Sequence, residues 1–143
     1  MIVHPARLPP AVIVHGLADA VAALAVGRPV TLLSAPAAAA HAGCLWWREM
    51  VAAARAACPA TEATDVLDCA DAPGLAMAAL RAGVIRLVLH ASTPAWDSVR
   101  GIAEARGGFV LPSAPSALDL GARNGAFRLR AWLATAASEA GEG

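Results

Sequence analysis

The chain has 143 residues, and its 11 basic side chains, all arginine, balance 11 acidic ones to give a formal net charge of zero. Without lysine, the chain cannot form a Schiff base with a carbonyl substrate or pyridoxal phosphate, and it cannot contain a Walker-type phosphate loop. The neutral charge gives no support for binding to nucleic acid or to an anionic membrane, so neither partner is expected.

The length predicts one domain over residues 1–143, with 1–9 and 139–143 as flexible tails. Hydrophobic residues make up 58% of the chain and charged residues 15%, whereas typical domains have about 45–50% and 25%. So few charges leave part of the surface apolar, which predicts a homo-oligomer, a dimer or larger.

The three cysteines, Cys44, Cys58 and Cys69, are odd in number and lack the spacing of a ligand set. This pattern is typical of free thiols in a reducing compartment, and Met1–Pro10 does not resemble a signal peptide, so a cytoplasmic location is expected. His41 and Cys44, three residues apart, could donate two metal ligands or form a thiolate–imidazole pair. No second motif supplies two more ligands, and we predict neither metal nor cofactor.

Short apolar runs alternate with helical stretches along the chain. Strands are predicted over 11–15, 30–34, 64–69, 84–90 and 108–111. Helices are predicted over 17–26, 38–57, 72–83, 94–107 and about 126–138. Asp71 is expected to cap the third helix, and Thr93 the fourth, with Pro94 at its first position. The stretch after Pro112 is consistent with either a loop or a short helix.

This alternation of strands and helices predicts an α/β fold, because strands joined by crossover helices run parallel. Right-handed crossovers place helices on the sheet and favour a three-layer, doubly wound architecture. We therefore predict a five-stranded, mostly parallel sheet, with the flavodoxin-like strand order 2-1-3-4-5 favoured.

Ligands of such sheets bind beyond the carboxyl ends of the strands, where this chain concentrates its polar side chains. His15 and His90 end two aliphatic runs, and Asp68 lies within a third. An imidazole can transfer a proton, and a carboxylate can orient it, so these three residues are the catalytic candidates. The alternative for each histidine is a hydrogen bond to a loop carbonyl. Candidates for ligand binding are Gly16, Ser34, Asp71, Ser92, Thr93 and Ser113.

Predicted helix N-termini also lie at this edge, and their free N–H groups favour a small anionic ligand. The turn after His15 lacks the G-x-G-x-x-G spacing, which disfavours a dinucleotide. Arg123, Arg128 and Arg130 could clamp an anion or form a solvated helix face.

Two neighbours of these candidates are expected to be structural. Cys69 follows Asp68 directly and is expected to face the opposite side of the sheet as a buried thiol. Trp46 and Trp47 must point to different sides of a helix, one into the core and the other toward solvent or a subunit contact.

Between Asp65 and Leu120, the layout resembles a response-regulator receiver domain, with Asp68, Ser92 and Leu111-Pro112 near that family's aspartate, Ser/Thr and Lys-Pro positions. His15-Gly16 replaces the family's acidic pair, and its lysine is absent, so the resemblance implies the fold but not phosphotransfer. The stretch 79–110 also resembles a βαβ unit of barrel-type keto-acid aldolases, whose Schiff-base lysine is missing here.

Two hypotheses follow for the function. The first is a binding, regulatory or assembly module with a small-ligand pocket at the carboxyl ends of the strands. The second is a small enzyme that uses His15, Asp68 and His90 for acid–base or hydrolytic chemistry at the same edge.

Overall fold

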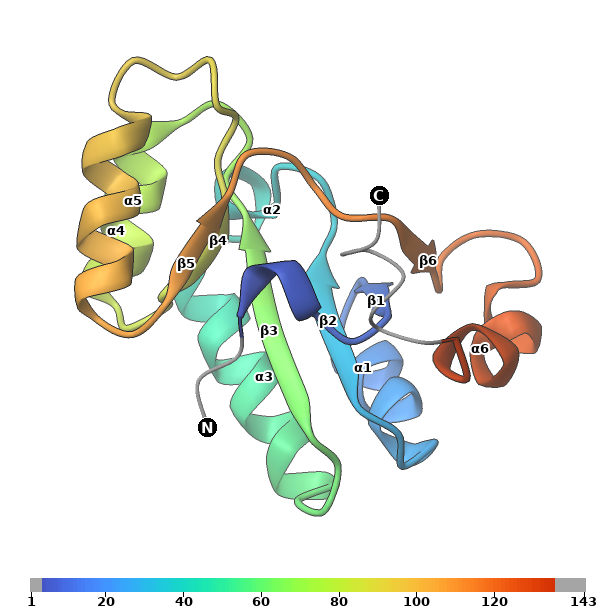
Figure 1. Ribbon diagram of the computed structural model, residues 1–143. Helices are drawn as coiled ribbons and strands as arrows, with labels where there is room; N and C mark the ends of the chain where they lie inside the picture. The colour runs from blue at the N-terminus through green and yellow to red at the C-terminus, as the bar shows by residue number, and fades with distance from the viewer. Residues whose placement is uncertain (1–3, 136–143) are drawn as a thin grey trace.

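In the computed structural model, residues 4–135 are described, and they form an α/β fold with a parallel sheet, as predicted (Figure 1). The strands are β1 (Ala11–Val14), β2 (Val30–Ser34), β3 (Ala63–Asp68), β4 (Arg86–Val88), β5 (Phe109–Leu111) and β6 (Ala117–Asp119). The helices are the 3-10 helix η1 (Pro5–Arg7) and the α-helices α1 (Leu17–Ala25), α2 (Ala38–His41), α3 (Cys44–Ala57), α4 (Pro73–Arg81), α5 (Trp96–Ala105) and α6 (Gly125–Leu133).

The sheet differs from the prediction in strand number and order. It has six strands in the order β5-β4-β3-β2-β1-β6, instead of five in the order 2-1-3-4-5. Each of the five pairings is parallel. The strands β1 to β5 therefore follow one another across the sheet in chain order. The last strand, β6, pairs with the other edge of β1. The strand order reverses between β1 and β6.

The α-helices pack their buried residues into one large core cluster on one face of the sheet. Because each crossover among the first five strands advances in the same direction, right-handed connections place their helices on the same side. A smaller cluster on the other face contains Leu33, Val66, Val88 and Phe109 from the sheet, together with Leu8. Leu8 follows η1, which lies across this face in Figure 1, so this part of the predicted N-terminal tail is packed against the sheet.

The helix predicted over 38–57 is two helices, α2 and α3, separated at Gly43. The backbone of Gly43 has φ +91° and ψ 157°, a conformation that is essentially restricted to glycine. The alanines on both sides favour helix, but this single residue ends the first segment and redirects the chain before Cys44.

Both predicted helix caps are wrong. The helix α4 has Ala72 at its N-cap position, with no side-chain cap hydrogen bond, although Pro73 is at its start as expected. The helix α5 begins at Trp96, after Ala95. The carbonyl of Thr93 accepts a hydrogen bond from the Trp96 N–H at 3.0 Å, so Thr93 and Pro94 form a turn before the helix.

The sixth strand lies in the region where the sequence suggested a loop or a short helix. It is only three residues long, Ala117–Asp119, and prolines precede it, so no periodicity marks it. Its pairing with β1 creates it: Ala11, Val12 and Ile13 are the Cα partners of Ala117, Leu118 and Asp119. The end of the last predicted helix and the tail 139–143 fall outside the described residues. None of the helices in residues 4–135 has the length and hydropathy that a membrane crossing requires.

We expect Gly43→Ala to lower the free energy of unfolding by about 1–3 kcal/mol, because alanine disfavours this φ. The space beside Gly43 is open, so the cost is one of backbone conformation alone. The matched control is Gly74→Ala in α4, which also meets no neighbour within 4 Å. It should stabilise the protein by about 0.5–1 kcal/mol, because alanine loses less entropy in a helix. Urea unfolding of both variants measures the difference, and equal effects would contradict this explanation.

Candidate functional site

The most specific polar contact at the carboxyl edge of the sheet (the edge formed by the C-terminal ends of its strands) joins His15 to Asp119. His15 follows β1, Asp119 ends β6, and Nε2 of the imidazole lies 2.6 Å from Oδ1 of the carboxylate. Both side chains reach solvent, with 42% and 40% of their surface exposed. The pair thus lies where the strand order reverses, and a ligand could reach it.

Backbone groups around the pair hold it in position. The N–H of Gly121 donates to the same Asp119 Oδ1 at 2.8 Å, and the N–H of His15 donates to Oδ2 of Asp19 at 2.9 Å. A Cβ at position 121 would lie 2.7 Å from Nε2 of His15, so any larger residue there would displace the imidazole. Gly121 is therefore a positioning residue for this contact.

The ionisation of Asp119 sets the hydrogen-bonding roles within the pair. The pKa of Asp119 lies below its ordinary value because His15 hydrogen-bonds the carboxylate; weak burial opposes this shift, and the Gly121 N–H and the charge of His15 reinforce it. An ionised carboxylate only accepts hydrogen bonds, so Nε2 of His15 carries a proton and donates it. In the neutral imidazole, Nδ1 then keeps its lone pair and can accept a proton or a hydrogen bond.

The sequence predicted His15 as a site residue but missed Asp119, its partner. The sequence suggested Asp68 as the carboxylate that orients a histidine. Asp119 escaped notice because β6 has no recognisable strand pattern, and the only available signal was a lone aspartate in the run Ala-Leu-Asp-Leu. Its role depends on the pairing of β6 with β1.

Asp68 and Ser34 form a structural contact at the ends of β3 and β2. The N–H of Asp68 donates to Oγ of Ser34 at 2.9 Å, and Ser34 Oγ donates to the carbonyl of Ala35 at 3.1 Å. Oδ1 of Asp68 accepts from the N–H of Ala70 at 2.8 Å, which supports the positive φ of 52° at Ala70. Both side chains are buried, and these hydrogen bonds account for their burial.

The three predicted catalytic residues do not come together. His90 follows β4, which β2 and β3 separate from β1. Asp68 ends β3, which β2 separates from β1. His90 is exposed, and its backbone N–H donates to the carbonyl of Ala70 at 2.8 Å. The strand order therefore does not bring His15, Asp68 and His90 together into one group, and a catalytic role for each of them stays a prediction.

The predicted ligand-binding residues are also spread along this edge. Gly16 is the N-cap residue of α1 and adjoins His15, whereas Asp71, Ser92 and Ser113 are exposed in the loops after β3, β4 and β5. Thr93 is buried, and its Oγ1 has no hydrogen-bond partner among the described residues. Of this group, only Gly16 adjoins the His15–Asp119 pair along the chain.

Cys69 is buried, whereas Cys44 and Cys58 are partly exposed. Cys69 is buried in the large core cluster, as predicted. Burial raises its pKa to about 12, with further contributions from Asp68 and Cys44, so at neutral pH it is a protonated, unreactive thiol. Within residues 4–135, no group of three or more His, Cys, Asp or Glu side chains is arranged to hold a metal ion.

The structure places one of the two adjacent tryptophans in the core and the three C-terminal arginines at the surface. Trp47 is fully buried and Trp46 is 37% exposed, so one ring packs in the core and the other faces outward, as expected. Arg123, Arg128 and Arg130 are exposed, consistent with the solvated face that was the alternative to an anion clamp.

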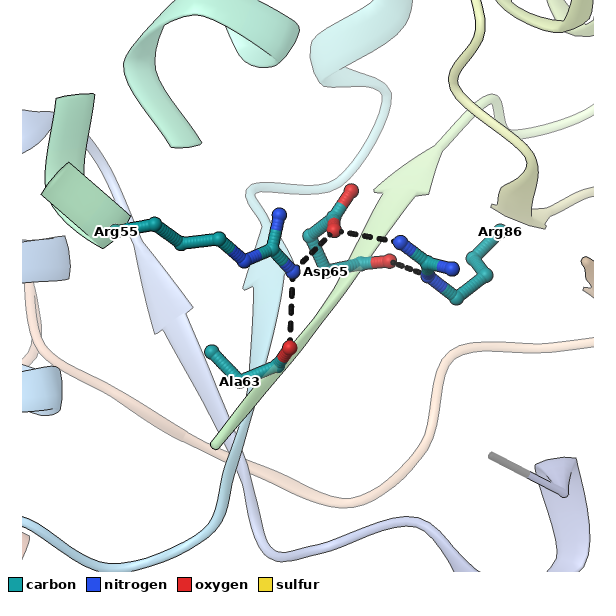
Figure 2. A network of polar contacts seen from close by, with 4 residues as sticks. All are labelled: Arg55, Ala63, Asp65 and Arg86. Atoms are coloured by element: carbon teal, nitrogen blue, oxygen red, sulfur yellow. Dashed lines mark hydrogen bonds and ion pairs between the residues drawn. The ribbon is translucent and has the colours of Figure 1, made fainter. Parts of the chain in front are cut away.

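A second polar cluster, which the sequence did not indicate, joins α3, β3 and β4 (Figure 2). Oδ1 of Asp65 accepts from Nη2 of Arg55 at 2.7 Å and from Nη2 of Arg86 at 2.9 Å. Arg55 also donates to the carbonyl of Ala63 at 2.9 Å, and Nε of Arg86 donates to the carbonyl of Asp65 at 3.1 Å. The cluster fastens the C-terminal end of α3 to the first half of β3, so its role is structural.

The buried carboxylate in this cluster is kept ionised by its partners. Burial alone would raise the pKa of Asp65, but the charges and hydrogen bonds of Arg86 and Arg55 outweigh it and hold the pKa below 3.8. The aspartate side chain is only 10% exposed, against 40% and 27% for the two arginines. Removing the carboxylate would leave two guanidinium groups without their counter-charge.

Comparison of the chain with protein-family models, with curated proteins and with solved structures found no match.

We expect Asp65→Asn to lower the free energy of unfolding at pH 7 by about 2–3 kcal/mol, because hydrogen bonds to charged groups are lost. Since the folded pKa is depressed, the unfolded state takes up the proton first as the pH falls. The loss of unfolding free energy in Asp65→Asn should be complete above about pH 5, and it should shrink as the pH falls through the pKa of Asp65 in the folded protein. Arg100→Gln, which removes exposed ion pairs, is the control and should cost less than about 1 kcal/mol. A deficit in Asp65→Asn that does not change with pH would contradict the ionic role.

We expect His15→Ala to raise the pKa of Asp119 toward 3.8, because the hydrogen bond from His15 is the largest cause of its depression. The pKa can be followed by NMR titration of the carboxyl carbon. His90→Ala is the matched control, and it should leave the Asp119 titration unchanged because β2 and β3 lie between. An identical Asp119 titration in His15→Ala would show that the contact does not form in solution.

Proposed function

We propose that this protein is a small-molecule binding module whose site is the carboxyl edge of β1 and β6, with His15 and Asp119 as its polar centre. The observation that supports this is the position of the pair at the reversal of the strand order. In open parallel α/β sheets, ligands bind in the crevice outside the strand ends at such a reversal.

The charges beside His15 favour a ligand with hydrogen-bond donors. Asp119 contacts its imidazole at Nε2, and Asp19 contacts its backbone N–H, so two carboxylates lie close to His15. Both would repel the small anion that the helix N-termini suggested from the sequence. A hydroxyl or an ammonium group, in contrast, could donate to Nδ1 and is attracted by the carboxylates.

Apolar side chains near this edge could contact the rest of such a ligand. Leu17, in the first turn of α1, follows Gly16 directly and is 46% exposed. Leu45 and Trp46, in the first turn of the neighbouring α3, are 57% and 37% exposed. Ligand sites combine apolar lining with a few polar groups of fixed geometry, which is the combination offered here.

General-base catalysis by His15 is the second candidate function, because a carboxylate orients the imidazole and leaves Nδ1 free to accept a proton. Such an enzyme needs a nucleophile at Nδ1. Among the hydrogen bonds of residues 4–135, no Ser, Thr or Cys side chain contacts His15. The nucleophile would therefore be water or the substrate itself, and binding is the function that the geometry supports better.

The proposal can be tested by NMR with protein in which the histidine rings are labelled with ¹⁵N. Ethanolamine and glycerol should shift the Nδ1 resonance of His15 in a saturable manner near pH 7.5, and inorganic phosphate should not. The same probes should give no saturable shift at the Gly121 amide in His15→Ala, whereas His90→Ala should retain it.

Three results would contradict the proposal. Saturable shifts with phosphate alone would show that the edge takes anions. Shifts that persist in His15→Ala would locate binding elsewhere. The absence of a saturable shift with both ethanolamine and glycerol would exclude a ligand of this class.

A further inference from the structure

The connection between β5 and β6 is unusually short for the distance that it crosses. It consists of residues 112–116, and it joins strands at opposite edges of the six-stranded sheet. In a flat sheet, five strand spacings amount to about 24 Å. The six steps from Leu111 to Ala117 reach at most about 20–22 Å when fully extended. A connection of this length could not close across a flat sheet.

Twisting of the sheet is what allows the connection to close within one chain. Phe109 and Leu111 of β5 belong to the same small apolar cluster as Ile13 of β1 and Ala117 of β6, so the two edges approach each other over this face. Figure 1 shows the chain crossing from β5 to β6 without a secondary-structure element of its own. Pro112 and Pro115 further restrict its backbone.

The unit after this connection, β6 and α6, is held to the rest of the protein by contacts that are independent of the connection itself. The strand pairs with β1, and the indole Nε1 of Trp132 donates to the carbonyl of Ala11 at 2.7 Å. Leu118, Leu129 and Leu133 pack in the large core cluster. Each of these contacts would be the same if the unit came from a second copy of the chain.

We propose that β6 and α6 are exchanged between two copies of this chain, so that β6 of each copy pairs with β1 of the other. Exchange of an identical element preserves the contacts it makes and is a low-cost route to a dimer, and short hinge connections favour it. The second copy is the occupant that fits, because the unit's polar partners are present on β1 and its apolar partners in the large core cluster. Phe127 of α6, 89% exposed, adds apolar surface on the exchanged unit.

The exchange would also change how the candidate site is built. Since His15 follows β1 and Asp119 ends β6, each His15–Asp119 pair in the dimer would combine side chains from two copies. This inference is independent of the proposed function, because the pair is equally complete within one chain. Dissociation of the dimer would separate His15 from Asp119 only if the two copies exchange β6 and α6.

The exchange can be tested with a disulfide between Ala11→Cys and Ala117→Cys, which are Cα partners on β1 and β6, in a background with Cys44→Ser, Cys58→Ser and Cys69→Ala. Their spacing across adjacent strands suits a disulfide. In the exchanged dimer, the oxidised protein should run as a covalent dimer on a denaturing gel. The matched control, Ala11→Cys with Thr31→Cys on β2, should form its disulfide within one chain.

A second measurement requires no cysteine substitutions. Light scattering of the natural chain at micromolar concentration should give twice the 14.4 kDa chain mass. Insertion of Gly-Ser-Gly-Ser between Ser113 and Ala114 gives the connection slack, and it should convert the dimer into a monomer. A natural chain of 14.4 kDa, or a dimer in which the Ala11–Ala117 disulfide stays within one chain, would overturn the exchange.

Discussion

The pairing of β6 with β1 is the interaction on which the carboxyl edge depends. Without it, β1 would be an edge strand, and His15 would have no carboxylate beside it. With it, the strand order reverses between β1 and β6, and Asp119 lies 2.6 Å from the imidazole. A ladder of three residues is weak by itself. Burial of Leu118 and Leu129 in the main core supplies most of the stabilisation, since each buried leucine contributes about 1.5–3 kcal/mol.

Charged residues in the terminal turns of four helices affect what the carboxyl edge can bind. Asp19 and Asp97 lie in the first turns of α1 and α5, and Arg55 and Arg81 lie in the last turns of α3 and α4. This distribution complements the helix dipoles. At the carboxyl edge, Asp119 and Asp19 both contact His15, and their charges offset the anion-binding capacity of the helix N-termini there. The formal net charge of zero does not reveal this separation of acidic and basic residues between helix starts and helix ends.

His15 and Asp68 illustrate how far sequence reasoning reached at the site. Each is a polar residue at the end of an apolar strand, and such a residue needs a partner or solvent. That reasoning holds for each, but the partners are different: Asp119 for His15, and the backbone of Ala70 for Asp68. Local pattern shows that a polar group needs a partner. It does not show which partner, because strands adjacent in space can be more than a hundred residues apart in sequence.

The alternation of apolar strands with helical stretches determined, by itself, the α/β class and the parallel direction of the sheet, because a crossover helix leaves no other geometry. The sequence also indicated that one of Trp46 and Trp47 would pack in the core and that Cys69 would be buried, and the structure identifies the buried tryptophan as Trp47. Only the tertiary structure decided the strand order and the existence of β6. A three-residue strand has too little periodicity to be seen along the chain, and it becomes a strand only through hydrogen bonds to β1. The candidate site follows from that pairing.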